Sequence, residues 1–212
     1  MTISVPIYVW LGAALVFGCS AFLAMRLAAF VYGNDAPLEG GPTPTNVPAF
    51  AMIAGAAVVG GIAAYHGTTL AGLAIVAIVV FALCAAIWTD VTRGFIGDWF
   101  TLPPLALVVA IAAFNHTFGP MLLSLAVVTV PFAIAALASK GRGMGWADVK
   151  LVALGAALLD IQTSILMYAV ACMVACAIAF ARRKRTEPIA FAPYLASAIA
   201  VGMILPTAHI AS

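Results

Sequence analysis

The chain has 212 residues, of which 66% are hydrophobic and only 8% are charged, with a formal net charge of +2. A soluble domain has about 25% charged and roughly 45–50% apolar residues, so no core folded in water holds this much apolar surface. The composition excludes a soluble globular protein, and we expect no nucleic-acid partner because the few basic residues lie in short loops. The sequence predicts a polytopic membrane protein whose partner is the lipid bilayer.

The apolar runs predict an all-α transmembrane bundle of about eight helices, within a range of six to eight. A helix needs about 20 apolar residues to cross the hydrocarbon core. On that rule the helices cover residues 6–32, 48–65, 68–88, 100–115, 119–138, 148–159, 162–181 and 188–207. The stretch 148–181 is too long for one span, and we divide it at Asp160. We expect residues 1–212 to form a single integral membrane domain, with an irregular cytoplasmic linker at about 33–47.

Basic residues occur in alternate predicted loops. The loops around 66–69, 115–119 and 159–162 and the segment 208–212 contain no Lys or Arg. The loops between them hold Arg93, Lys140, Arg142 and the run Arg182–Arg185. Cytoplasmic loops carry an excess of Lys and Arg, so the basic loops are expected to face the cytoplasm. Asp90 and Asp148 then lie at the same, cytoplasmic, face of the membrane.

Asp90 and Asp148 stand at the margins of apolar segments in a chain with only seven acidic residues. Ionisable groups this close to a bilayer are costly and are functional candidates by default, and two together suggest a shared-proton aspartyl site. Structural roles are open for both: Asp90 as an interfacial carboxylate, either hydrated or paired with Arg93 three residues on, and Asp148 as the cap of a helix that begins at Val149. For Asp98 we predict the N-cap of the fourth span.

Three alternating glycines, Gly141, Gly143 and Gly145, come just before Asp148. Glycine adopts backbone conformations that are closed to other residues, so this segment is expected either to admit an extended peptide beside the carboxylate or to be an ordinary flexible loop. Lys150 follows; it is a candidate for setting the protonation of the acid, for binding substrate, or for anchoring the helix end at the cytoplasmic face.

The remaining candidate metal ligands indicate no metal site. The four cysteines, at positions 19, 84, 172 and 176, lie in apolar runs without a C-x-x-C pair, which favours packing as small apolar residues. The three histidines, at positions 66, 116 and 209, are expected in or near loops on the outer face. We therefore expect no metal and no cofactor.

Three sequence blocks carry a family resemblance. They are Asp90-Val-Thr-Arg-Gly-Phe-Ile-Gly-Asp98 followed by Thr101-Leu-Pro103, Gly143-Met-Gly-Trp-Ala-Asp-Val-Lys-Leu-Val-Ala-Leu-Gly155, and Pro188-Ile-Ala-Phe-Ala-Pro-Tyr-Leu195. In this order the blocks resemble the type IV prepilin peptidases, which are polytopic aspartyl proteases of the bacterial inner membrane. The resemblance implies that Asp90 and Asp148 are the catalytic pair at the cytoplasmic face. It also implies that the substrate is a prepilin or pseudopilin precursor, from which a basic leader is cut.

Five further residues in these blocks are expected to bind substrate or support the site. They are Gly143, Gly145, Ala147, Lys150 and Asp98. The chain departs from the family pattern at two positions, since Ala147 replaces the usual glycine and Gly97 the usual proline. Ala147 would be strained if its position needs a positive φ. The segment 33–47 lacks the family's cysteine-rich insert, which is linked to zinc and to N-methylation, so methyltransferase activity is not expected.

Two other functions compete with the peptidase. A catalytically inactive relative that acts in pilus or secretion assembly is motivated by Ala147. A small transporter or channel is the third reading, but it would place charges near the bilayer midplane and break helices there. The predicted position of both acids at one edge argues against it. The sequence alone does not set an oligomeric state.

Overall fold

The computed structural model describes residues 6–35, 48–66, 69–139, 144–181 and 190–205, and these residues form eight helices. The helices are α1 (Ile7–Tyr32), α2 (Ala49–Tyr65), α3 (Leu70–Arg93), α4 (Asp98–Phe114), α5 (Phe118–Ala138), α6 (Trp146–Leu158), α7 (Ile161–Ala181) and α8 (Ala192–Met203). The expected all-α bundle of about eight helices is confirmed.

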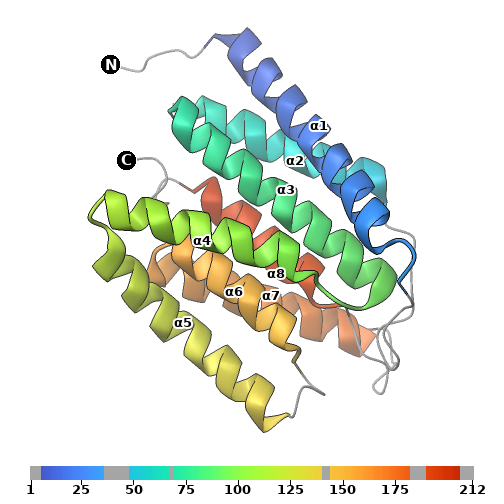
Figure 1. Ribbon diagram of the computed structural model, residues 1–212, viewed down its shortest axis with the longest axis vertical. Coiled ribbons are helices and arrows are strands. Elements are labelled where there is room, and N and C mark those ends of the chain that lie inside the picture. The colour runs from blue at the N-terminus through green and yellow to red at the C-terminus, as the bar shows by residue number, and fades with distance from the viewer. Residues whose placement is uncertain (1–5, 36–47, 67–68, 140–143, 182–189, 206–212) are drawn as a thin grey trace.

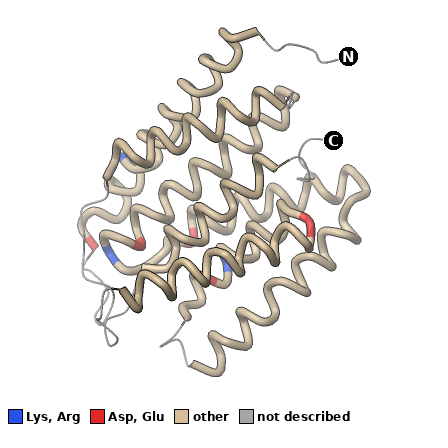
Figure 2. Tube along the Cα trace, turned by 180° about the vertical axis from the view of Figure 1, so that it is seen from behind, with Lys and Arg blue, Asp and Glu red and all other residues tan. Residues whose placement is uncertain are grey.

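Consecutive helices run in alternating directions along the bundle (Figure 1). In such an arrangement, the ends of α1 and α3 lie at the same end of the molecule as the beginnings of α4, α6 and α8. Figure 2 shows most of the described charged residues toward that end, with one acidic segment at the other. Alternation thus places segments that are far apart in the sequence at one end of the bundle.

Four helices are long and apolar enough to cross a membrane by length and composition: α1, α3, α5 and α7. The helices α2, α4 and α8 are also apolar but shorter. Many large apolar side chains point outward, and Phe30, Phe50, Leu70 and Phe114 are each 84–85% exposed. Such a surface is stable in lipid and not in water. The protein is therefore a multi-pass membrane protein.

The short helix α6 lies in the core of the bundle. Its side chains Leu151, Val152, Leu154 and Leu158 are at most 2% exposed. Gly155 lets the Tyr168 side chain of α7 pack directly against the backbone of α6, because a Cβ at this position would lie 2.0 Å from the Tyr168 hydroxyl. That hydroxyl donates a 3.0 Å hydrogen bond to the carbonyl of Val152. Both α4 and α8 pack against α6 and also against α3, so these neighbours fix α3 relative to α6.

The division of the long apolar stretch at Asp160 is confirmed. The carboxylate of Asp160 accepts hydrogen bonds from the Thr163 backbone N–H at 2.7 Å and from the Thr163 hydroxyl at 3.0 Å. These bonds satisfy donors that the first turn of a helix leaves free. Asp160 thus caps the start of α7, at the end of the bundle opposite to the start of α6.

The helix α3 ends five residues later than predicted, at Arg93 instead of residue 88. Gly94 terminates it with φ 77°, a left-handed conformation that glycine adopts without a Cβ clash, and its N–H bonds back to the carbonyl of Asp90. The two threonines and the aspartate of Trp88-Thr-Asp-Val-Thr-Arg93 therefore continue the helix. As a consequence, Asp90 lies in the last turn of α3, and the helix backbone holds its side chain in place.

Candidate active site

Asp90 is a buried carboxylate at the end of α3. Its side chain is 7% exposed, and Oδ2 accepts a 3.0 Å hydrogen bond from the backbone N–H of Ala192, the first residue of α8. The preceding residue, Thr89, is fully buried and donates to the carbonyls of Ala85 and Ala86. A buried carboxylate needs such a partner because desolvation destabilises its charged form. The bond also fixes which oxygen faces α8.

Asp148 occupies the third position of α6, a helix that begins at Trp146 and not at Val149. Its Oδ2 accepts a 3.2 Å hydrogen bond from the backbone N–H of Gly145, the N-cap residue. Asp148 therefore does cap the start of a helix, as one reading of the sequence allowed, but it does so from the third position inside that helix. A carboxylate in a first turn also interacts favourably with the helix dipole. Asp148 is only partly buried, so it is more accessible than Asp90.

The fold brings Asp90 and Asp148 together, and the two side chains are close enough to interact electrostatically. They come from α3 and α6, which share the neighbours α4 and α8. Two carboxylates that interact in surroundings of low polarity do not both ionise cheaply, and they release their protons in two coupled steps. Acid–base chemistry by two carboxylates requires one of them to be protonated while the other is ionised, and an interaction of this kind favours that state.

Asp98 and Lys150 form an ion pair between α4 and α6. Lys150 Nζ lies 2.5 Å from Asp98 Oδ1, and the side chains are 36% and 57% exposed. The prediction that Asp98 is the N-cap of its helix is wrong by one residue: Gly97 is the N-cap, and Asp98 is the first residue of α4. Its carboxylate is directed to Lys150 of α6 instead. The pair joins the beginnings of α4 and α6.

Arg93 does not pair with Asp90, although the helical spacing of the two residues allowed such an ion pair. Its guanidinium donates to the backbone carbonyls of Gly33 and Asp35, the latter at 2.8 Å. Gly33 is the C-cap of α1, where carbonyls lack partners within the helix. A planar guanidinium satisfies two such carbonyls at once. Arg93 therefore anchors the end of α3 to the end of α1, and Asp90 turns toward α8.

Both departures from the family pattern fit the local structure. Ala147 has an ordinary helical backbone, since the only positive φ values among the described residues are at Gly94 and His116. The strain that would follow from a positive φ at this position is thus absent. At Gly97, a Cβ would lie 2.5–2.7 Å from the ring and hydroxyl of Tyr32. Glycine is required there because Tyr32 packs against it, and not because the turn needs flexibility.

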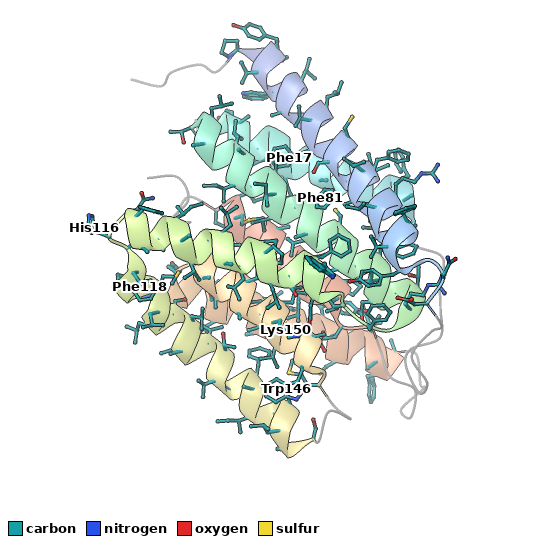
Figure 3. The ribbon with its side chains drawn as sticks, in the orientation of Figure 1. Phe17, Phe81, His116, Phe118, Trp146 and Lys150 are labelled. Atoms are coloured by element: carbon teal, nitrogen blue, oxygen red, sulfur yellow. The ribbon has the colours of Figure 1, made fainter. Side chains whose placement is uncertain are left out.

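Some of the other candidate residues lie outside the described residues, and the rest can be placed in the structure. Gly143, with Gly141, lies outside the described residues, as do Lys140, Arg142, His209 and the run Arg182–Arg185. Gly145 contributes its N–H to Asp148, and its φ of −78° is open to any residue. His116 lies at the turn before α5, and Figure 3 shows it at the opposite end of the bundle from Lys150 and Trp146.

Sequence reasoning missed the part played by Ala192. Its side chain is apolar and carries no chemistry, and the functional atom is a backbone N–H. The available signal was the third block, where Pro193 at the second helical position marks the start of a helix. A helix start always leaves N–H groups without partners, and a nearby carboxylate is a suitable acceptor.

The fold and the site together define a multi-pass helical membrane protein with two interacting carboxylates at one end of the bundle. Comparison with protein families makes this specific. The type IV leader peptidase family matches residues 75–181, about half of the chain, and the chain belongs to this family. The match includes Asp90, Asp98 and Asp148 and ends before α8. No curated protein and no solved structure matches the chain.

Proposed function

We propose that the protein is an intramembrane aspartic endopeptidase in which Asp90 and Asp148 are the catalytic pair. Membership of the leader peptidase family indicates a peptidase. The observation that carries the proposal further is the interaction of two carboxylates from α3 and α6, helices that share the neighbours α4 and α8; of the two, Asp90 is only 7% exposed. A structural ion pair would join opposite charges, whereas here two like charges are brought together. Such an arrangement is costly and is typical of a catalytic site.

The pair hydrolyses a peptide bond by acid–base chemistry. The ionised carboxylate removes a proton from a water molecule as its oxygen adds to the scissile carbonyl carbon. The protonated carboxylate donates a hydrogen bond to the carbonyl oxygen and polarises it. Collapse of the tetrahedral intermediate breaks the C–N bond, and a proton from the pair passes to the leaving amine. One water molecule is consumed, and a carboxylate and an amine are released.

The proposed substrate is a prepilin or pseudopilin precursor with a basic leader and a following apolar segment. The described charges lie mainly at the same end of the bundle as Asp90 and Asp148 (Figure 2). The basic loops of the sequence favour a cytoplasmic location for this end in the bacterial inner membrane. Because residues 33–47 contain no cysteine, we expect the protein to cleave without methylating the new N-terminus.

Cleavage of a candidate precursor in membranes tests this proposal. Asp90→Asn and Asp148→Asn should each abolish cleavage, because an amide neither ionises nor releases a proton. Asp35→Asn is the matched control: it makes the same chemical change on an exposed carboxylate near the end of α1, and it should leave cleavage intact. Full processing by either single variant, with the variant present in the membrane at normal level, rejects the catalytic pair. Mass spectrometry of the product should show an unmethylated N-terminus.

An inactive relative that assists assembly is the second candidate, and Ala147 motivated it. The helical backbone at Ala147 removes the physical reason to expect a damaged site. This candidate predicts that the wild-type protein cleaves no precursor and that assembly tolerates asparagine at both positions. The cleavage assay therefore separates the two candidates.

A further inference from the structure

We propose that a groove between α2, α3 and α8 holds the apolar helix that follows the scissile bond of the substrate; this proposal rests on the peptidase function above. The groove is a cavity of about 590 Å³, lined by residues of these three helices and of the segments next to them. Figure 1 shows that α2 and α8 both lie behind α3. The walls are almost wholly apolar, and the side chains of Met52, Leu83 and Ile87 contribute to them.

One end of the groove begins at the candidate active site. Val91 and Pro193 both line the groove. Val91 follows Asp90 in α3, and Pro193 follows Ala192, whose N–H is bonded to Asp90. The lining of the groove thus comes within one residue of Asp90 on α3 and within one residue of Ala192 on α8. A substrate segment that lies in the groove has its end next to the catalytic pair.

The groove then runs away from the site along two helices. Its lining extends from Val91 back to Val80 on α3, and from Pro193 to Ile204 along and just beyond α8. At 1.5 Å per residue, eleven helical residues cover about 16 Å. The groove is thus about three helical turns long and parallel to α3, which is long and apolar enough to span a membrane. A helix lying in it would also cross the membrane, with its cytoplasmic end at Asp90.

Small residues on both sides permit a close approach by a second backbone. Gly55 on α2 and Ser197 on α8 line the groove and are exposed, while Ala200 is partly buried. In lipid, helices associate chiefly through packing at such small residues. A Cβ built at Gly55 meets no atom within 4 Å, so the space beside this glycine is open. A transmembrane helix can therefore pack closely against the small residues of the groove, and its apolar side chains can contact the apolar walls.

Narrowing the groove tests the proposal. Gly55→Leu and Ser197→Leu introduce a large side chain from opposite sides, and Gly12→Leu is the matched control. Gly12 also lies inside a helix, is exposed, and has no atom within 4 Å of a built Cβ, but it does not line the groove. Two substrates are compared with each variant: the full precursor, and a peptide that spans the scissile bond but lacks the apolar helix.

We expect both groove variants to raise KM for the full precursor by about tenfold, since filling a packed contact weakens binding. Their kcat/KM for the short peptide and all constants of Gly12→Leu should stay at wild-type values. An unchanged KM for the precursor overturns the proposal that the groove binds the substrate helix. If the variants then lose bound phospholipid or change in oligomeric mass, the groove holds a lipid or a second copy of the chain instead. Equal loss for both substrates also overturns the proposal. If one groove variant fails to accumulate, the other decides.

The peptidase function fails in a different way. In that case the wild-type protein cleaves neither substrate, or Asp90→Asn cleaves as well as wild type does. If only the groove proposal is wrong, the wild-type protein still cleaves the precursor, and this cleavage still requires Asp90 and Asp148. The two proposals are thus separated by the same set of measurements.

Discussion

The carboxylate of Asp90, in the last turn of α3, accepts a 3.0 Å hydrogen bond from the backbone N–H of Ala192 in the first turn of α8, 102 positions away. The first turn of a helix has N–H groups without partners and carries a partial positive charge. The buried carboxylate of Asp90 satisfies one of them. The bond therefore positions a proposed catalytic group and also fixes the start of a helix that lines the substrate groove.

This relationship predicts that two substitutions of Asp90 separate activity from stability. Asp90→Asn should abolish cleavage but retain the fold, because the amide oxygen still accepts from Ala192. Asp90→Leu should abolish cleavage and also lower the free energy of unfolding by about 1–3 kcal/mol, since it leaves a buried N–H unsatisfied. Thermal unfolding in detergent, with the cleavage assay alongside, measures both effects. Equal stability of the two variants would show that the bond to Ala192 contributes little to the fold.

Gly145 should be replaceable by alanine but not by proline. Its backbone has φ −78°, and a Cβ would contact Asp148 Oδ2 at an ordinary 3.5 Å. Gly145→Ala thus keeps the N–H that binds Asp148, and cleavage should stay within about twofold of wild type, as expected when no contact is lost. Gly145→Pro removes this donor and should reduce kcat by releasing the carboxylate. Loss of activity in the alanine variant would point to a need for flexibility at this position.

Gly97→Pro, which introduces the family's usual residue, should destabilise this protein. The φ of −69° at Gly97 suits proline, so the backbone itself does not oppose the change. The obstacle is the Tyr32 ring, which a Cβ would approach to 2.5–2.7 Å. We expect a loss of about 1–3 kcal/mol in the free energy of unfolding, as for other overpacked sites.

A Tyr32→Ala background provides the control for this prediction. With the ring removed, the additional cost of Gly97→Pro should disappear, because nothing remains for the new side chain to overlap. A double-mutant cycle on thermal unfolding measures the coupling between the two positions. If the cost is the same in both backgrounds, the clash with Tyr32 is not its cause.

Asp98 and Lys150 should behave as one unit. The pair is largely exposed, so removing either charge should change the free energy of unfolding by less than about 1 kcal/mol. Asp98→Asn and Lys150→Met should lower cleavage to a similar extent, and the double variant should be no worse than either, because each breaks the same link between α4 and α6. If Lys150 instead binds substrate directly, Lys150→Met alone raises KM and Asp98→Asn has no effect.

Much of the architecture could be predicted from local patterns. The length and hydropathy of the apolar runs predicted each helix, because burial in lipid requires continuous apolar segments of a set length. Asp160 was predicted as a break in the stretch 148–181, and its carboxylate caps the start of α7. Boundaries were less accurate: α3 continues to Arg93 because Gly94, and not the first polar residue, terminates it.

One open alternative and one error at the site share a physical reason, which is competition between partners from different helices. The sequence placed Arg93 one turn from Asp90, but the carbonyls of Gly33 and Asp35 at the end of α1 bind its guanidinium instead. Likewise Asp98 was predicted to cap its own helix, and its carboxylate pairs with Lys150 of α6. Local spacing describes which contacts are possible, and packing selects among them.

The sequence by itself determined that the chain lies in a membrane, that it forms about eight helices, and that Asp90 and Asp148 are its costly charges. These properties follow from composition and from free energies of transfer that act residue by residue. Only the tertiary structure decided that the two carboxylates interact, that Asp90 is bound by Ala192, and that an apolar groove begins beside them. These relationships join atoms of α3, α6 and α8, and the packing of helices that are far apart in the chain brings them together.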